Sequence, residues 1–361
     1  MENLVNPDFW EGRRVFLTGH TGFKGSWLAL WLVEMGAEVT GFALPAEDVS
    51  LFNQAGIANL VTHIEGDIRD LDAVDAAMAA CDPQVVFHLA AQPIVRTSYD
   101  DPVGTYATNV QGTVHVLDAC RRAASLDAIV CVTSDKCYEN REWIWPYRES
   151  DPMGGHDPYS SSKGAAEIAI ASYRRSFFEG EGAPLLASVR AGNVIGGGDW
   201  AVDRLIPDIV RAMVAGERVQ IRSPHAVRPW QHVLEALGGY LLIAQRLAKG
   251  ERDYADGWNF GPADSDTQPV GWIVEKMINE WGEGGFDLDD GPKPHEANLL
   301  RLDCSKARAK LGWQPALGLA ETIRWIVAWH RSVADGGDAR AITSEQLTQY
   351  RARMERALQG A

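Results

Sequence analysis

The sequence predicts an α/β protein with a doubly wound parallel sheet and a smaller, mixed α/β domain after it. Three observations support this prediction. Short β-branched runs alternate with longer helical patterns through the first half, a glycine-rich turn follows the first run, and the alternation stops after residue 190. Alternation of this kind places parallel strands between two layers of helices, so we expect both faces of the sheet to be buried.

Each strand is predicted from a short apolar run, and each helix from apolar residues three or four positions apart. The expected strands are Arg14–Thr18, Glu38–Ala43, Leu60–Glu65, Val85–Leu89, Ala128–Thr133 and Leu185–Arg190. The expected helices between them are Gly25–Met35, Leu71–Ala80, Tyr106–Ala124 and Tyr159–Phe178. Helical crossovers of this length are the connections that parallel strands require.

The second half has a mixed pattern. Gly192–Trp200 is rich in glycine, which indicates a loop over a ligand. The other expected elements are helices Leu205–Ala215, His232–Ala248 and Ser344–Leu358 and strands Val219–Arg222 and Trp258–Gly261. We therefore expect a first domain of residues 1–190 and about 230–260, a second of 191–229 and 261–335, and a C-terminal helical tail of 336–361, after the polar linker Ala334–Asp338.

The composition excludes several classes of protein. A hydrophobic content of 46% is ordinary for a globular protein, and a net charge of −15 repels phosphate backbones, so no nucleic-acid partner is expected. The five cysteines are odd in number and form no C-x-x-C pair, which indicates reduced thiols in the cytoplasm and no metal site. No run approaches the roughly 18 apolar residues of a membrane span, and the N-terminus does not resemble a signal peptide.

A glycine-rich turn follows the first expected strand. Gly19, Gly22 and Gly25 form G-x-x-G-x-x-G between a strand and a helix. Glycines allow a tight turn and a close approach of the backbone to a pyrophosphate, and the N-terminus of the helix offers free N–H groups. This context predicts a Rossmann-type dinucleotide site; the alternative is a plain tight turn.

Other positions decide which dinucleotide is expected. Asp67, just past the third strand, can accept from an adenine amino group or can instead cap the next helix. His88 ends the fourth strand and is more simply a packed histidine than a catalyst. The second strand ends without an acid for a ribose hydroxyl and without an arginine for a 2′-phosphate, which favours NAD, although Lys24 or Arg69 could reverse this preference.

Two segments carry residues suited to acid and base chemistry. Tyr159 and Lys163 are four positions apart at the start of a helix, so they share a face. We expect Lys163 and a nicotinamide cation to lower the pKa of the phenol by about three units. Ser134, Asp135 and Lys136 follow the fifth strand, at the edge where doubly wound sheets bind ligands. The alternative for these three is a capped turn with a salt bridge.

Residues 13–330 resemble the extended short-chain dehydrogenase/reductase family, and within it most closely the CDP-glucose 4,6-dehydratases. The shared segments are Thr18–Trp27 (TGHTGFKGSW), His88–Pro93 (HLAAQP), Thr133–Tyr138 (TSDKCY), Arg190–Trp200 (RAGNVIGGGDW) and Arg228–Glu235 (RPWQHVLE). The resemblance implies NAD as cofactor, with the first domain holding it and the second holding a nucleotide sugar. The implied cofactor ligands are Gly19, His20, Thr21, Gly22, Phe23, Lys24, Gly25, Asp67, Ile68, Leu89, Ala90, Ala91, Thr133, Tyr159 and Lys163.

The resemblance also implies a reaction. Tyr159 takes the proton of the C4 hydroxyl while NAD accepts a hydride, Ser134 holds the C4 oxygen, and Asp135 protonates the departing C6 hydroxyl. Lys136 stands where related enzymes have a glutamate base, so the base at C5 stays open. The implied substrate ligands are Gln92, Asn193, Arg204, Leu205, Arg228 and Asn259, with Glu296 and Arg301 as further candidates.

The family further implies a homodimer through helices 106–124 and 159–178 and a role in deoxysugar biosynthesis, such as that of lipopolysaccharide O-antigen. Two other functions are compatible with the same fold. A nucleotide-sugar 4-epimerase shares Tyr159 and Lys163 but does not need Asp135, and a non-enzymatic NAD-binding sensor needs none of the three.

Overall fold

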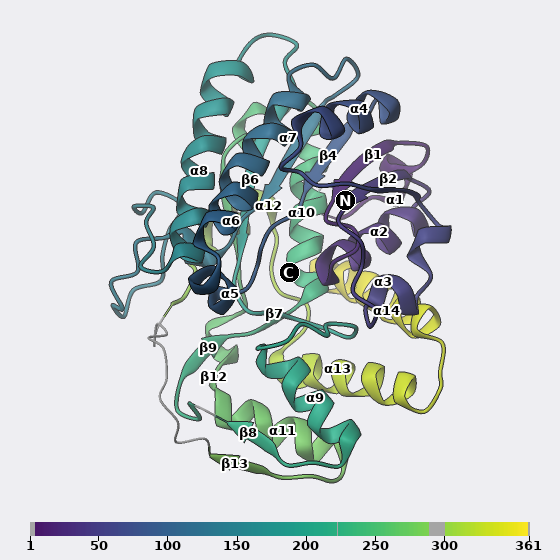
Figure 1. Cartoon of the computed structure of the whole chain (residues 1–361), viewed down its shortest axis with the longest axis vertical. Coiled ribbons are helices and arrows are strands. Elements are labelled where there is room, and N and C mark those ends of the chain that lie inside the picture. The colour runs from purple at the N-terminus through teal and green to yellow at the C-terminus, as the bar shows by residue number, and fades with distance from the viewer. Residues whose placement is uncertain (1–3, 222, 289–299, 360–361) are drawn as a thin grey trace.

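A computed structural model describes residues 4–221, 223–288 and 300–359. At its centre is a seven-stranded sheet, in which all neighbouring strands are parallel, with the order β11-β6-β5-β4-β1-β2-β3 (Figure 1). The strands are β1 Arg14–Thr18, β2 Glu38–Ala43, β3 Thr62–Glu65, β4 Val85–His88, β5 Ala128–Val132, β6 Leu185–Ala191 and β11 Gly257–Phe260. The order reverses between β1 and β4, which confirms the doubly wound sheet.

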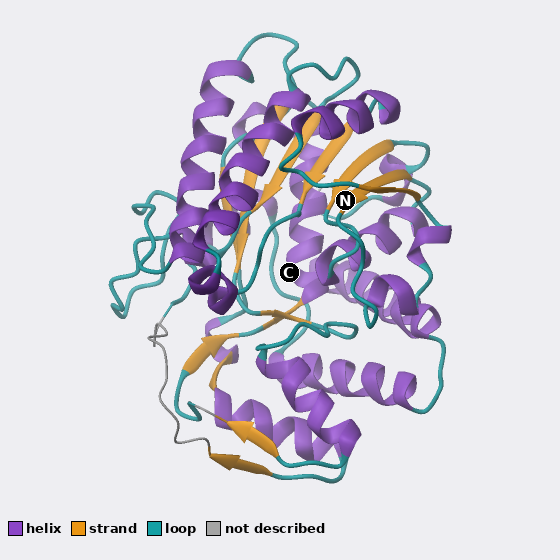
Figure 2. Ribbon diagram, viewed as in Figure 1, coloured by secondary structure: helices purple, strands orange, loops and turns teal. Residues whose placement is uncertain are grey.

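Helices cover both faces of this sheet (Figure 2). Alternate side chains of a strand point to opposite faces, and Val15 and Leu17 accordingly pack in one core and Phe16 in the other. The first core is covered by α2 (Phe23–Glu34) and α10 (Val233–Ala248). The second is covered by α4 (Leu71–Cys81), α7 (Thr113–Cys120) and α8 (Pro158–Phe177).

A smaller domain lies at the carboxyl end of the sheet (Figure 1). Its core is formed mainly by α9 (Leu205–Ala215), α11 (Val270–Trp281) and α13 (Leu319–Ala334). Short strand pairs complete it: β8 (Val219–Ile221) with β13 (Phe286–Leu288), and β9 (Val227–Pro229) with β12 (Thr267–Pro269). Because α10 and β11 return to the main sheet between these segments, the chain crosses between the two domains several times.

The other elements are short connections and the last helices. They are α1 Pro7–Trp10, α3 Leu51–Gln54, η1 Ile57–Asn59, α5 Val95–Asp100, α6 Pro102–Tyr106, η2 Ala107–Gly112, η3 Asp135–Cys137, β7 Val194–Ile195, β10 Gln231–His232, η4 Arg252–Tyr254, η5 Asp264–Asp266, α12 Ser305–Leu311 and α14 Ala339–Gln359. Within the described ranges, no helix has the length and apolar character needed to cross a bilayer.

The structure corrects two predicted helices. The single helix expected at 106–124 is divided, because η2 is a π-helical segment and α7 ends at Cys120. Asn109 lies in η2 and bonds the Gln92 backbone in both directions, at 2.8 and 3.0 Å, which fixes this wider turn. The last helix begins at Ala339, earlier than expected. The strand predicted over Val219–Arg222 is present as β8 at Val219–Ile221, and Arg222 lies outside the described residues.

The C-terminal helix is part of the first domain rather than a separate tail. Tyr350 on α14 packs edge-on against Trp31 of α2, with ring centroids 5.8 Å apart. Its hydroxyl donates to Glu235 Oε2 at 2.9 Å. Glu235 Oε1 also accepts from the backbone N–H of Ala316 and Leu317, at 2.9 and 2.7 Å. One buried carboxyl therefore joins α10, α14 and the segment before α13.

Candidate active site

The glycine-rich turn has the geometry of a phosphate-binding loop. Gly19 has φ +77°, and a Cβ there would lie 2.7 Å from the nitrogen of Ala90. A Cβ at Gly25 would lie 2.1 Å from the oxygen of Gly19, so α2 packs directly on the turn. Gly22 is the N-cap of α2 and makes no side-chain cap, which leaves the N–H groups of the first turn available to an anion.

His20 lies inside this turn, and its side chain packs in the interior of the protein instead of facing the groove. The ring is fully buried and shares a 2.7 Å hydrogen bond with His63. Burial, reinforced by His63, lowers the pKa of His20 to about 4, so the ring is neutral. A Cβ at Gly41 would lie 2.3 Å from this ring, so His20 fills the space beside β2. We therefore retain only its backbone as a cofactor contact.

The carboxylate of Asp67 already has partners within the protein. It accepts from the backbone N–H and the Nε of Arg69, both at 2.8 Å, and these bonds, led by the guanidinium, hold its pKa below the ordinary value. The N-cap of α4 is Asp70, so the alternative capping role of Asp67 is wrong. Ile68 is buried in the core, and its carbonyl is 3.0 Å from Nδ1 of His115, so its side chain lines no cofactor groove.

The end of β4 lies against the glycine turn. His88 is hydrogen-bonded to Thr18 and Thr113, at 2.7 and 3.0 Å, and burial lowers its pKa to about 3, which confirms a packed strand histidine. Thr18 Oγ1 also accepts from the N–H groups of Leu89 and Ala90. The backbone after β4 is thus fixed beside Gly19. Of the other expected ligands, Ala91 follows this segment, Thr21 donates to the Leu44 carbonyl at 3.0 Å, and Phe23 opens α2.

A phenol, a hydroxyl and a carboxyl converge at the carboxyl edge of the sheet. Tyr159 lies in the first turn of α8, whose N-cap Asp157 accepts from the N–H of Ser160. Its phenol lies next to Ser134, which caps η3 after β5 and favours the ionised phenol. Ser134 Oγ in turn donates to Asp135 Oδ1 at 2.9 Å. The sequence prediction that Asp135 lies beside Tyr159 is consistent with this geometry.

The protein alone does not make Tyr159 a base at neutral pH. Burial raises the pKa of the phenol to about 12, although the bond from Ser134 opposes this rise. Lys163 is also buried, and burial lowers its pKa to about 8. The sequence prediction combined Lys163 with a nicotinamide cation; in the protein alone, burial of the phenol dominates its pKa.

Positive charge gathers around this chain of groups. Burial, together with the nearby charges of Arg204 and Lys163, lowers the pKa of Lys24 to about 8. Arg204 directs Nη1 to Asp199 Oδ2 at 3.2 Å, and Asp199 is almost fully buried. The Asp199 carboxylate, from the glycine-rich loop, thus orients Arg204 at the start of α9. The arrangement suits an anionic substrate.

Lys136 lies next to Asp135 in η3 and is half-buried. Its backbone N–H donates to Ser134 Oγ at 3.2 Å, so the turn is capped as the alternative interpretation expected. No ion pair between Asp135 and Lys136 accompanies it, and within the described chain the ammonium has no recorded hydrogen bond. The amine is available to a ligand.

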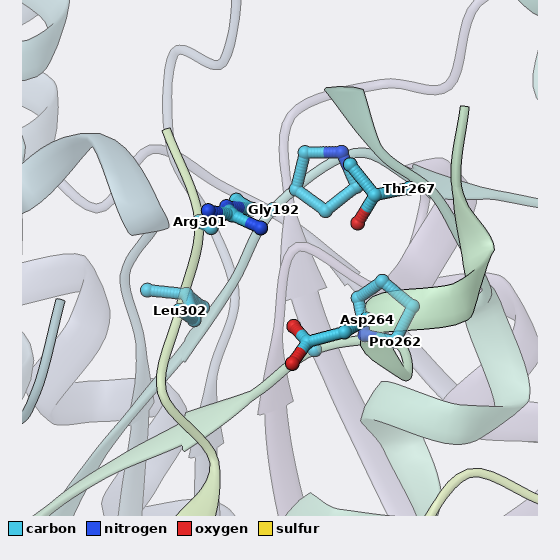
Figure 3. A pocket seen from close by; sticks show the side chains of 8 residues that line it. Gly192, Pro262, Asp264, Thr267, Arg301 and Leu302 are labelled. Carbon is cyan, nitrogen blue, oxygen red and sulfur yellow. The ribbon is translucent and has the colours of Figure 1, made fainter. Parts of the chain in front are cut away.

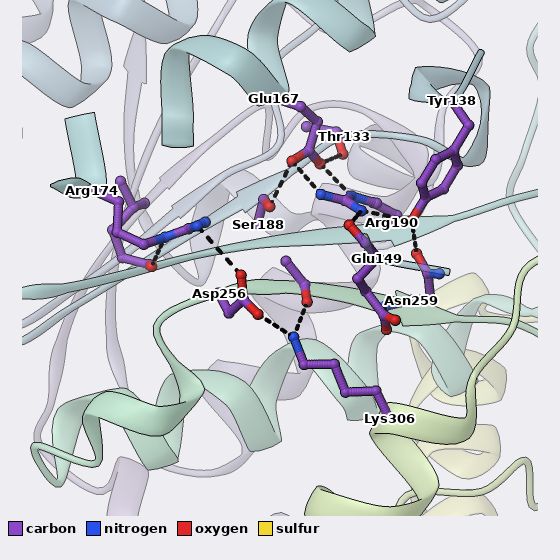
Figure 4. A network of polar contacts seen from close by, with 12 residues as sticks. Thr133, Tyr138, Glu149, Glu167, Arg174, Ser188, Arg190, Asp256, Asn259 and Lys306 are labelled. Atoms are coloured by element: carbon purple, nitrogen blue, oxygen red, sulfur yellow. Dashed lines mark hydrogen bonds and ion pairs between the residues drawn. The ribbon is translucent and has the colours of Figure 1, made fainter. Parts of the chain in front are cut away.

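A buried polar network joins Thr133, the residue before Ser134, to Glu167 on α8 and through it to Arg190 on β6 (Figure 4). Arg190 on β6 and Glu167 on α8 form two parallel bonds of 2.8 Å, with side chains only 5% and 3% exposed. Thr133 donates to Glu167 Oε1 at 2.5 Å, so its hydroxyl is not free for a cofactor. The sequence prediction missed this pair, because the two residues are distant in the chain and only the sheet brings them together.

The same network occupies Asn259. Its Nδ2 donates to the carbonyls of Tyr147 and Asp303, at 2.9 and 3.2 Å, and its Oδ1 accepts from the Tyr138 hydroxyl at 2.7 Å. The side chain is fully buried, so we do not retain Asn259 as a substrate ligand. Gln92 is similarly engaged, donating to Thr105 at 2.9 Å.

A pocket lies between the two domains, beside the end of β6 (Figure 3). Its enclosed volume is about 10 Å³, and its lining is Gly192, Pro229, Gly261, Pro262, Asp264, Thr267, Arg301 and Leu302. Arg301 is the candidate arginine of the sequence prediction; its Nη2 donates to the Ile144 carbonyl at 2.7 Å. Arg228 adjoins the pocket in β9, and Leu205 begins α9. Glu296 lies outside the described residues.

Asn193 has a strained backbone. Its φ is +41°, which is uncommon for a residue with a side chain and is typical of ligand sites. The carbonyl of Asn193 accepts from the N–H of Gln231 at 3.3 Å. This contact fixes the turn between β6 and β7, immediately after the pocket residue Gly192.

A phosphate-binding turn on a Rossmann-type sheet, with Tyr159 and Lys163 beside Ser134, defines the extended short-chain dehydrogenases/reductases. The profile of the family described as GDP-mannose 4,6 dehydratase matches residues 16–326, and this chain belongs to that family.

Comparison with known proteins agrees. A CDP-glucose 4,6-dehydratase of Salmonella typhimurium is 52% identical over 354 residues, which are 96% of this chain and 98% of that protein. A dTDP-glucose 4,6-dehydratase of Streptomyces venezuelae, solved with NAD bound, has a TM-score of 0.76 at 22% identity and covers 90% of this chain and 99% of its own. A UDP-glucose 4-epimerase of Thermus thermophilus in complex with NAD has a TM-score of 0.75 at 23% identity, covering 88% and 99%. The two solved structures support the fold alone.

Proposed function

We propose that this protein is an NAD-dependent lyase that converts CDP-D-glucose into CDP-4-dehydro-6-deoxy-D-glucose and water. The observation that carries the proposal is the convergence of Tyr159 with Ser134 and Asp135, which offers a base for one hydroxyl and an acid for another. An epimerase needs only the first of these groups. The 52% identity with a CDP-glucose 4,6-dehydratase supports the choice of substrate.

The residues present fit NAD. The free N–H groups at the start of α2 and the turn at Gly19 suit a pyrophosphate, and the backbone at Ala90 lies against the same turn. The end of β2 carries no arginine, and the guanidinium of Arg69 is already bonded to Asp67, which favours NAD over NADP. When bound, NAD would supply a hydride acceptor for C4 and a hydride donor for C6, and its positive charge would favour the ionised phenol of Tyr159.

The protein groups divide the proton transfers. Tyr159 takes the proton of the C4 hydroxyl, and Ser134 donates a hydrogen bond to the C4 oxygen as it becomes a ketone. The ketone acidifies the proton at C5. Asp135 gives its proton to the C6 hydroxyl, so the C6–O bond breaks with loss of water. The sugar loses one water molecule in total, because the proton taken from C5 and the hydride taken from C4 are both returned.

Lys136 is the best-placed candidate for the base at C5. It directly follows Asp135, and within the described residues its ammonium has no recorded partner that would hold the proton.

The experiment is a product analysis. The protein is incubated with NAD and CDP-glucose, and in parallel with dTDP-, UDP- and GDP-glucose, and the products are weighed by mass spectrometry. We expect loss of one water from CDP-glucose, and none with Tyr159→Phe. Unchanged mass with altered sugar stereochemistry indicates a 4-epimerase, and no turnover of any nucleotide sugar indicates a binding protein.

We also propose a cytoplasmic homodimer that acts in deoxysugar biosynthesis for a cell-surface glycan such as O-antigen. Large apolar side chains are exposed on α5, α6 and α8: Tyr99, Val103, Tyr106, Ile168 and Phe177. Val103 is 79% and Ile168 62% exposed, which is typical of a surface covered by a partner. The solution mass from light scattering, with Ile168→Arg as the disrupting variant, tests the dimer.

A further inference from the structure

The carboxylate of Asp135 occupies the place where any other residue at position 192 would carry its Cβ. A Cβ on Gly192 would lie 2.0 Å from Asp135 Oδ2, 2.6 Å from Cγ and 3.3 Å from the Asp135 Cβ. Asp135 is 4% exposed, and Gly192 is buried as well. Because ordinary contacts of a Cβ begin near 3.4 Å, a methyl group at position 192 and this carboxyl cannot coexist.

Small adjustments do not relieve this contact. Turning the carboxylate about χ2 moves its oxygens but not Cγ, which is itself too close. Relief requires a new χ1 rotamer for Asp135 or a shift of η3, and either change moves Oδ1 away from its 2.9 Å bond with Ser134. The backbone at Gly192 is also held, since its carbonyl accepts from Gln231 Nε2 at 3.5 Å and the next residue is fixed by Gln231.

We infer that Gly192 is a positioning residue for the acid of the elimination step. The space left by its missing side chain, called the seat below, holds the Asp135 carboxyl and directs it toward the C6 hydroxyl. Gly192 also lines the pocket of Figure 3. This inference rests on the proposed dehydratase function and names a determinant of its second step.

Gly192→Ala therefore displaces the acid without replacing Tyr159, Lys163 or any residue of the cofactor turn. A displacement of about 1 Å costs a positioned catalytic group about 100-fold in rate. We expect that loss in the kcat for CDP-glucose. The affinity for CDP-glucose, measured by calorimetry without NAD, should stay near that of the wild type.

A substrate with a better leaving group separates a misplaced acid from general damage. In CDP-6-deoxy-6-fluoroglucose the C5–H and C6–F bonds break, the C5 proton goes to the base, and fluoride departs with the electron pair of its bond, so no proton need be delivered at C6. Gly192→Ala should retain most of its fluoride release, measured with an ion electrode. The ratio of the two activities then changes by about 100-fold.

Gly261→Ala is the matched control. It adds a methyl group to the same pocket, but at ordinary distances of 3.4 Å from Cys304 and 3.6 Å from Leu302. If it gives the same change of ratio, filling the pocket rather than moving Asp135 is the cause, and the inference is wrong. It is equally wrong if Gly192→Ala turns over CDP-glucose at the wild-type rate or loses both substrates alike.

A second variant covers the case in which Gly192→Ala does not fold. Asp135→Glu keeps the acid but adds one methylene, which pushes the carboxyl out of the seat. It should show the same selective loss on CDP-glucose, and full activity there would overturn the inference. Wild-type protein that processes neither substrate contradicts the proposed function instead, so the two failures are distinguishable.

Discussion

Glu167→Gln is expected to lower the melting temperature by about 4–7 °C. The change keeps the shape of the side chain but removes the charge opposite Arg190, whose guanidinium is 5% exposed and bonded to Glu167 at both ends. Removing one partner of a buried pair costs about 3–5 kcal/mol, because the other charge stays buried without compensation. An unfolding entropy of about 2.1 cal/mol/K per residue gives about 0.76 kcal/mol/K for 361 residues, and hence this range.

Scanning calorimetry of the purified variant measures the change. Glu179→Gln, at an exposed glutamate just after α8, is the matched control and should stay within about 0.5 kcal/mol of the wild type. The double variant Glu167→Met, Arg190→Met should recover much of the loss, because it removes both charges. Two results would contradict the desolvation of this pair that the geometry indicates. One is a melting temperature of Glu167→Gln equal to that of the wild type, and the other is a double variant less stable than Glu167→Gln.

Three further predictions follow from named contacts. Tyr159→Phe should reduce kcat about 100- to 10,000-fold with little change in melting temperature, since only the proton acceptor is lost; equal loss of substrate binding would argue against that role. Arg204→Met should raise KM for CDP-glucose more than it lowers kcat, and steady-state kinetics at several substrate concentrations decide this. Burial raises the pKa of Glu235 to about 7, so its contribution to stability is full below about pH 4.5 and is lost as pH rises through about 7. Glu235→Gln should remove about 3 kcal/mol of that decline between about pH 5 and pH 8 in denaturant titrations, and an unchanged slope would contradict the assignment.

Local patterns were enough to predict much of this protein. The bounds of β1, β2 and α9 were predicted without error, because alternation and helical spacing are properties of neighbouring residues. The glycine turn at Gly19 and the shared face of Tyr159 and Lys163 are likewise local. The proximity of Tyr159 to Asp135 was predictable as well, because the ends of parallel strands lie at one edge of the sheet.

Contacts between distant segments were decided only by the tertiary structure. The side chain of Asn259 is not free for a ligand, because it is hydrogen-bonded to Tyr138, Tyr147 and Asp303. These three residues are distant from Asn259 in the sequence. The raised pKa of Tyr159 depends on burial, which its spacing from Lys163 does not reveal.

The seat of Asp135 at Gly192 is the clearest example of this division. Both residues were visible in the sequence, one as a candidate acid and one as the first glycine of a loop. Their contact depends on β5 and β6 lying side by side in register, with Val132 opposite Val189, so that the segments after the two strands meet. The sequence by itself determined which groups are present at the sheet edge, and the packing of those groups decided which of them are free to act.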